Sequence, residues 1–445
     1  MLPKKPSLSS TQCSHDSICL LSSSYADEAD YTRPTPQKLK AALSVSKGKA
    51  KESAKKERSD EKVINTTTFP SPLVLPNDDI SLDPGYLPQD LESWIHEEER
   101  NKITPRKNVV YVAAPPNIDS SVPFIRQWDA PQIKCKTHPT APGIDDVLNY
   151  IKGFYHGLPV KPFSVPLAFT SWESGNSRDS KTKDKPHYVG FNIKTECVRI
   201  RTRASPDGVF PRQLNLDDLL DAAISMLPKD AYALILLVKQ DLYESADDQF
   251  VCGRAYGGSR VAVVSMARYN PTLDGRQNVD REHSWPASHC QRYIDSLSAA
   301  PRPKKRTKIA NSAQEPRPDD ITSPLHAALL AHKSLPSLEL FPTATQLSGL
   351  WLGRVCRTAS HELGHCFGID HCMYFACSMQ GSASLTEDAR QPPYLCPIDL
   401  AKMLQATGTT AKERYLALLS FCEEHEQTHL FAAYGAWLSR RLEEL

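Results

Sequence analysis

Residues 361 to 371 read His-Glu-Leu-Gly-His-Cys-Phe-Gly-Ile-Asp-His, and this stretch decides the fold. His361 and His365 stand four residues apart, so on a helix both imidazoles lie on one side, one turn from each other. At that separation both can bind one Zn²⁺ through bonds of about 2.0 to 2.1 Å. The spacing therefore predicts a metal-binding helix at this point of the chain.

The sequence before the histidines predicts the body of that helix. No proline occurs from Thr345 to Phe367, and apolar residues recur there on one helical face. Gly368 is expected to end the helix, because glycine readily adopts the left-handed backbone angle that turns the chain back. That turn would return His371 to the same metal. Three histidine ligands leave the fourth position open, which is the catalytic arrangement of zinc.

Glu362 lies next to the first histidine and is expected to reach a water on the metal. Zn²⁺ lowers the pKa of such a water toward about 7, and a neighbouring carboxylate can take its proton and pass it to a leaving amine. The pattern thus predicts peptide-bond hydrolysis by a zinc-bound water that Glu362 activates. A histidine pair alone is common on helices, but here a glutamate and a glycine are also in register.

Upstream segments predict an α/β (α+β) fold with a mixed core sheet and a long active-site helix. An amphipathic helix is expected over 214 to 226, a strand buried on both faces over 231 to 238 and another strand over 261 to 266. A short strand at 109 to 112 and a helix over 144 to 154 precede them. Helix, buried strand, turn and strand in this order form an α/β layer.

The folded domain is expected to span residues 106 to 445. Residues 1 to 105 are rich in Ser, Pro, Lys and Glu and lack a sustained period, so they are predicted to be a disordered N-terminal region. Residues at about 298 to 325 are predicted to be an inserted disordered loop. The basic run from Lys304 to Lys308 within it is either a solvated linker or a nuclear import signal.

The segment from His361 to Cys396 resembles the archaemetzincins, a metzincin-like family of zinc metallopeptidases. The third histidine is followed at once by Cys372, then by Cys377-Ser-Met, and later by Cys396-Pro-Ile-Asp399, where the family has Cys-x-x-Cys. The resemblance covers residues 108 to 430 apart from the inserted loop. It implies a zincin/metzincin-like fold and a peptidase with an aminopeptidase-like or otherwise restricted preference.

The same resemblance implies two zinc ions per chain, one catalytic and one structural. The catalytic ion would lie on the three histidines, with Met379 in a tight turn beneath them. The structural ion would lie on Cys372, Cys377 and Cys396, with Asp399 at the position of the fourth cysteine. A carboxylate binds Zn²⁺ at about 2.0 to 2.2 Å against about 2.3 Å for sulfur, so Asp399 is expected to complete the tetrahedron. The alternative is a lost site with three reduced thiols.

Composition bears on partners and location. The formal net charge of +1 gives no field that would attract nucleic acid or an anionic membrane. No apolar run is long enough to span a bilayer, and the first residues make a poor signal peptide. Twelve cysteines are too sparse for a disulfide scaffold, and several crowd beside histidines, as in metal sites of a reducing compartment. We therefore expect an intracellular protein of cytoplasm, nucleus or both, acting on a peptide or protein, with the oligomeric state open.

Two other functions remain as alternatives. A non-catalytic zinc scaffold would bind a partner with the same fold, but it has no need of Glu362. A nucleic-acid-associated protein would use Lys304 to Lys308, but no aromatic residues are interleaved with these lysines. The sequence gives Cys13 and Cys290 no ligand spacing and predicts inert thiols there, and it predicts a structural role for His283.

Overall fold

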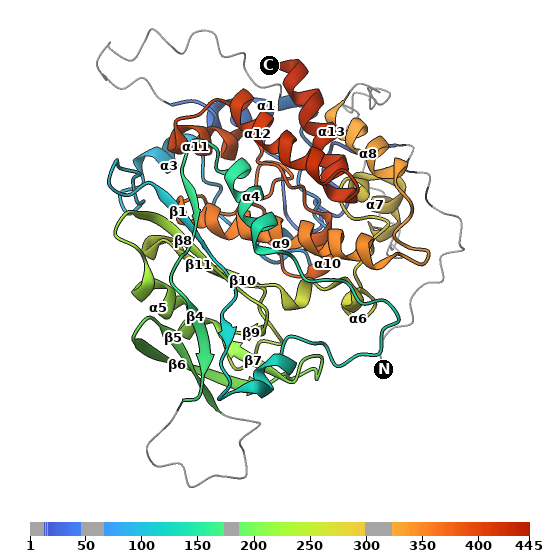
Figure 1. Cartoon of the computed structure of the whole chain (residues 1–445). Helices are drawn as coiled ribbons and strands as arrows, with labels where there is room; N and C mark the ends of the chain where they lie inside the picture. Colours follow the sequence, from blue (N-terminus) through green and yellow to red (C-terminus); the bar gives the residue numbers. More distant parts are fainter. Residues whose placement is uncertain (1–12, 14, 16, 46–65, 173–186, 299–322) are drawn as a thin grey trace.

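The computed structural model of the chain describes residues 13, 15, 17–45, 66–172, 187–298 and 323–445 (Figure 1). A five-stranded sheet has the order β10-β11-β8-β1-β3, in which β10 is antiparallel to β11 and the other pairs are parallel. Its strands are β1 (Val109–Ala113), β3 (Val160–Pro162), β8 (Ala231–Val238), β10 (Gly253–Tyr256) and β11 (Val261–Ser265). The mixed core sheet was predicted correctly.

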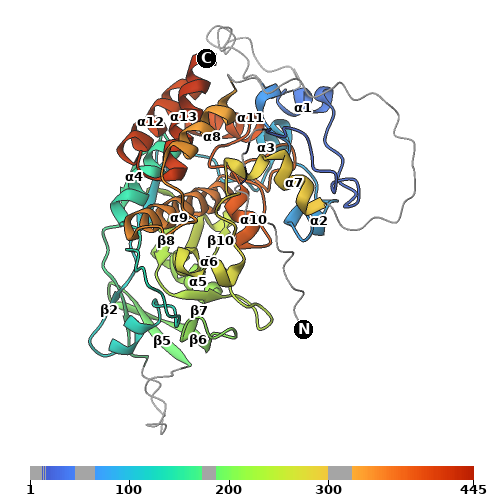
Figure 2. The same cartoon turned by 90° about the vertical axis from the view of Figure 1, so that its right-hand side faces the viewer.

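Strand β8 separates two hydrophobic cores. All eight of its residues are buried, as the continuous apolar run predicts. Tyr232, Ile235 and Leu237 pack in the core that contains α9 (Ala344–Cys366) and α4 (Ile144–Phe154). Leu234 and Leu236 pack in the other core, with α5 (Leu216–Met226). The sheet is therefore covered on both faces, with α9 on one side and α5 on the other (Figure 2).

A second, six-stranded sheet has the order β2-β4-β5-β6-β7-β9 and adds to the core of α5. Its strands are β2 (Asn117–Ile118), β4 (Leu167–Thr170), β5 (Tyr188–Ile193), β6 (Glu196–Ala204), β7 (Arg212–Asn215) and β9 (Asp241–Tyr243). The remaining helices are α1 (Pro36–Ala42), α2 (Asp79–Leu82), α3 (Leu91–His96), α6 (Asp274–Gln277), α7 (Gln291–Ser298), α8 (Pro324–Ser334), α10 (Leu385–Arg390), α11 (Pro397–Thr407), α12 (Ala411–Glu424) and α13 (His429–Glu444). Within the described ranges, no helix is both long and apolar enough to cross a bilayer.

The prediction that residues 1 to 105 are disordered is wrong for the described part of that region. Phe69 and Trp94 are fully buried in the same core as α9, and Trp94 Nε1 donates a hydrogen bond of 3.0 Å to the Phe367 carbonyl. Short helices and irregular backbone carry these anchors, so no sustained period marks them in the sequence. Residues 299–322, which hold the basic run and most of the predicted inserted loop, lie outside the described residues.

Candidate active site and cysteine cluster

Helix α9 carries the first two histidines near its C-terminal end. The helix begins with a capping box formed by Thr343 and Gln346 and ends just before Gly368, which has a φ of 72°. The turn at this glycine brings His371 back to His361 and His365, as predicted. One ring nitrogen from each histidine lies within 4.8 Å of the others.

Backbone carbonyls orient two of the imidazoles, and a carboxylate lies near the third. His361 Nδ1 donates to the Ser378 carbonyl at 2.7 Å, and His365 Nδ1 donates to the Ile369 carbonyl at 2.8 Å. The Nε2 atoms of these two rings then face each other at 3.1 Å. His371 Nδ1 lies 4.0 Å from a carboxylate oxygen of Asp79. An acceptor behind each ring is the usual support of metal-binding histidines, because it fixes the tautomer and the ring orientation.

The electrostatics of the histidines favour their neutral forms. Burial and the charge on His371 lower the pKa of His365 to about 4. Burial and the two other rings also lower the pKa of His361 well below its ordinary value. Neutral imidazole is the form that ligates a metal, so both residues are ready to bind at neutral pH.

Glu362 lines the same cavity as the three histidines. Its side chain is 9% exposed, and burial raises its pKa to about 8, against a lowering effect of Arg254. Strand β10 runs beside it, and a Cβ added at Gly253 would stand 3.4 Å from Glu362 Cγ. Glu362 is thus a largely buried carboxyl group at the wall of the cavity.

Met379 supports the helix from below. It is fully buried, and its sulfur packs against Gly364, where an added Cβ would collide with it. Gly364 lies between the two histidines of α9, so only a residue without a side chain lets the methionine approach this closely. The predicted placement of Met379 in a turn beneath the histidines agrees with this geometry.

The cavity has a volume of about 1000 Å³ and runs between α9 and β10. Among the described strands β10 pairs with β11 alone, so its other backbone edge faces the cavity. A strand edge of this kind can accept an extended peptide as an additional strand.

Sequence reasoning missed two residues of the cavity region because both lie in the segment predicted to be disordered. Asp79, the first residue of α2, stands behind His371, and Tyr86 lines the cavity with its ring centroid 6.1 Å from that of His371. A short helix with one buried apolar residue, Ile80, leaves no periodic signal. The Asp-Asp pair at 78 and 79 was the only cue to a helix start.

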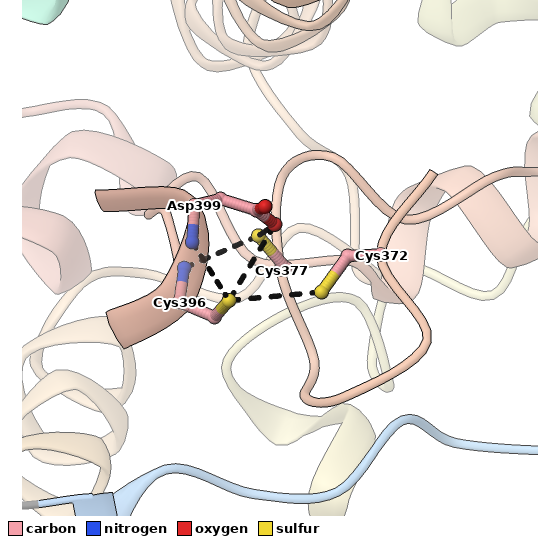
Figure 3. A group of neighbouring side chains, drawn as sticks. All are labelled: Cys372, Cys377, Cys396 and Asp399. Atoms are coloured by element: carbon pink, nitrogen blue, oxygen red, sulfur yellow. Dashed lines mark hydrogen bonds between the residues drawn. The ribbon is translucent and has the colours of Figure 1, made fainter. Parts of the chain in front are cut away.

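The predicted cysteine cluster is also brought together (Figure 3). Ligand atoms of Cys372, Cys377, Cys396 and Asp399 all lie within 4.8 Å of one another, and all four residues are buried. The Cys372 and Cys396 sulfurs are 3.6 Å apart, and Asp399 Oδ2 lies 3.3 Å from the Cys377 sulfur. Backbone N–H groups of Met379 and Cys396 donate to the Cys377 sulfur at 3.4 and 3.1 Å. Such donors stabilise a thiolate.

Asp399 has two oxygens with different environments. Oδ2 faces the sulfurs of Cys377 and Cys396, whereas Oδ1 accepts a hydrogen bond of 2.9 Å from Lys402. Lys402 also donates to the side chain and backbone oxygens of Gln89. Burial and the nearby Cys372 thiol raise the pKa of Asp399 to about 6, and Lys402 lowers it in part. One carboxylate oxygen is therefore left for a metal.

Comparisons with known proteins agree with these sites. The sequence profile of peptidase family M54 matches residues 332–405, which contain all three histidines and the whole cysteine cluster. Archaemetzincin-2 of Homo sapiens is 25% identical over 402 residues, covering 88% of this chain and 87% of the relative. The Mus musculus Archaemetzincin-2 is 23% identical over 337 residues, covering 76% and 70%. The predicted resemblance to the archaemetzincins is confirmed.

A solved archaemetzincin from Methanopyrus kandleri is 18% identical and matches 68% of this chain and 97% of its own, with a TM-score of 0.31. The chain is thus similar to a peptidase family over residues 332–405 and to archaemetzincins over most of its length.

Proposed function

We propose that this chain hydrolyses peptide bonds in a peptide or protein substrate, with Zn²⁺ held by His361, His365 and His371 and with Glu362 as the group that moves protons. The observation that carries the proposal is the convergence of three oriented imidazoles and one buried glutamate on a single cavity. A non-catalytic scaffold would explain the histidines but not the glutamate.

The three histidines fit zinc by donor type, number and orientation. One ring nitrogen of each histidine lies near the other two. The Nε2 atoms of His361 and His365 face each other at 3.1 Å, and because both protons are on Nδ1, both Nε2 lone pairs are free to bind a cation. When bound, zinc polarises the scissile carbonyl and lowers the pKa of a water toward about 7. Three ligands from the protein leave room for that chemistry.

Glu362 is assigned the proton transfers. As a carboxylate it accepts a proton from the attacking water, and as the acid it returns that proton to the leaving amine. Burial raises its affinity for the proton, and a dication on the adjacent histidines would lower it again. These opposing effects suit a group that must be both base and acid near neutral pH.

Strand β10 is assigned the positioning of the substrate. An extended peptide paired with the exposed edge of Gly253–Tyr256 would run along the cavity beside Glu362. Backbone hydrogen bonds hold such a peptide without regard to its side chains, so the preference would arise from the other walls of the cavity.

The aminopeptidase-like preference is part of the proposal. Asp370 lines the cavity next to His371, and a carboxylate oxygen of Asp79 lies 4.0 Å from Nδ1 of that histidine. Two carboxylates near one end of the site would attract a free terminal ammonium group. Hydrolysis of peptides with free and with acetylated amino termini separates this preference from internal cleavage.

We also propose a second, structural zinc on Cys372, Cys377, Cys396 and Asp399. The burial of four ligand atoms in a closed cluster supports a structural role, since catalytic zinc keeps an open position. Lys402 holds Asp399 Oδ1 by a hydrogen bond, and this contact turns Oδ2 toward the sulfurs. Asp399 is therefore proposed to bind the zinc through Oδ2.

The intracellular location, in the cytoplasm, the nucleus or both, stays a proposal that rests on the sparse cysteines and on the basic run outside the described residues. The central test is hydrolysis of a peptide library by the zinc-loaded chain and by its Glu362→Ala and Glu362→Gln variants.

A further inference from the structure

A third group of metal-ligating side chains lies outside both sites. Cys13, His15 and His283 each offer one ligand atom, and these three atoms lie within 4.8 Å of one another. Cys13 and His15 lie near the N-terminus. His283 lies far along the chain, in the loop before the short helix at Ala287–His289. The separation in sequence explains why the ligand spacing is invisible in the chain.

Each of the two histidines has one buried ring nitrogen without a hydrogen-bond partner within the described ranges of the chain. Among the described residues, His15 Nε2 and His283 Nε2 are both buried and neither makes a hydrogen bond of ordinary geometry. A buried nitrogen without a partner destabilises the folded chain. Two such nitrogens beside one thiol are the arrangement expected of side chains that share a metal cation.

His283 has the support expected of a metal ligand. Its Nδ1 is paired at 2.8 Å with Asp280 Oδ2, which leaves Nε2 as the coordinating nitrogen. Its ring also stacks on Tyr293, with centroids 4.0 Å apart and an interplanar angle of 5°. A carboxylate behind a histidine fixes the ring and increases its basicity toward a metal.

Cys290 lies beside Cys13 and is the candidate fourth ligand, although it falls outside the set of three whose ligand atoms all lie within 4.8 Å of one another. Its sulfur lies 3.5 Å from that of Cys13. Two sulfurs on one tetrahedral Zn²⁺, with bonds of about 2.3 Å, stand about 3.8 Å apart, so the observed distance needs little change. Cys290 is also buried, which is typical of a closed structural site.

We infer that Cys13, His15, His283 and Cys290 form a further structural metal site of the Cys₂His₂ type, with Zn²⁺ as the occupant. Thiolate and imidazole donors together select zinc among the abundant divalent ions. The site is independent of the proposed peptidase function, because none of its four ligands belongs to the cavity lining or to the cysteine cluster.

The metal would fasten the N-terminal segment to the domain. Two backbone hydrogen bonds already join the same elements and form an antiparallel bridge between Ile18 and Cys290: Cys19 N–H donates to the His289 carbonyl at 2.8 Å, and Gln291 N–H donates to the Ser17 carbonyl at 2.9 Å. The binding free energy of a structural metal adds to the folding free energy of the segment that it holds. Metal loss would therefore release the first residues of the segment from the 280–291 loop.

The test uses the full wild-type chain, purified under reducing conditions and loaded with zinc. N-ethylmaleimide labels its thiols, and mass spectrometry of peptides follows Cys13, with the exposed Cys197 on β6 as an internal control outside the site. The site predicts that Cys13 is protected until a chelator such as EDTA is added and that zinc then restores the protection. Two results overturn the inference. Protection that only a reductant removes would show a Cys13–Cys290 disulfide, and labelling that ignores chelator would show a simple thiol beside a histidine.

Metal analysis of variants gives a second, independent measurement. Cys13→Ser and His15→Ala should each lose one zinc per chain relative to wild type, whereas Cys19→Ser should lose none. Cys290→Ser should lose the same zinc under mild chelation. Equal zinc content in wild type, Cys13→Ser and His15→Ala would contradict the site. Because the loss is counted against wild type, the result does not depend on whether the peptidase is active.

Discussion

Lys402 Nζ lies 2.9 Å from Asp399 Oδ1, and both side chains are buried. The lysine occupies one oxygen of the carboxylate and so directs the other toward the cysteine sulfurs. A buried carboxylate beside three thiols would be costly unless cations balance it. Lys402 supplies one positive charge, and a metal at the cluster would supply the rest.

Asp399→Ala is expected to lose one zinc per chain under mild chelation, because three thiolates then share the ion with water. Asp399→Cys restores the cysteine of the family pattern, so it should hold this zinc at least as tightly as the wild type does. Mass spectrometry of the native chain with graded chelator measures both. Asp399 is not a ligand if the alanine variant keeps its full zinc content.

Gly364→Ala is expected to lower the free energy of unfolding by about 1 to 3 kcal/mol, because the new methyl group would collide with the Met379 sulfur. In an ordinary helix this exchange stabilises by about 1 kcal/mol. Gly275→Ala in α6 is the matched control, since nothing lies within 4 Å of its added Cβ. Urea unfolding of both variants decides whether the methionine contact is real, and equal stabilities would contradict it.

Asp79→Asn is expected to reduce zinc affinity at the histidine site, or activity, by up to about 10-fold, the lower end of the effect of removing a group behind a metal-binding histidine, because the contact is longer than a hydrogen bond. The carboxylate lies 4.0 Å from His371 Nδ1, and the amide keeps its size but not its charge. Competition with a zinc chelator measures the affinity. Unchanged zinc affinity and kcat/KM would show that Asp79 does not support His371.

Trp94→Ala is expected to cost about 3 to 5 kcal/mol of stability, the range for a fully buried aromatic side chain. The change removes both its packing and its hydrogen bond to the Phe367 carbonyl at the end of α9. Thermal and urea unfolding measure the loss. A change within about 0.5 kcal/mol, as for surface positions, would show that the segment before residue 106 is not part of the folded domain.

Local patterns predicted the elements that build the centre of the fold. Continuous apolar sequence identified β8, and the histidine spacing and Gly368 identified the end of α9 and the return of His371. The cysteine cluster was predicted through the family pattern. These features depend on residues close together in the chain, where periodicity and turn chemistry act.

Contacts between distant segments could not be predicted in the same way. Asp79 and Tyr86 reach the site, and Trp94 reaches the end of α9, from a region whose composition indicates disorder, because a few anchors hold irregular backbone in place. The Cys13 and His283 cluster likewise joins residues 270 positions apart (283 − 13). Such pairs have no shared period, so only the folded chain brings them together.

Peptide hydrolysis by the zinc-loaded chain and by its Glu362→Gln variant tests the central proposal most directly. Glutamine keeps the size of the side chain but cannot carry the proton, and zinc should stay bound because Glu362 is not a ligand. The account predicts that kcat falls by at least about 100-fold, the contribution of a general base, while zinc content is unchanged. A variant that cleaves the library as fast as wild type, or a zinc-loaded wild type that cleaves nothing, would contradict it.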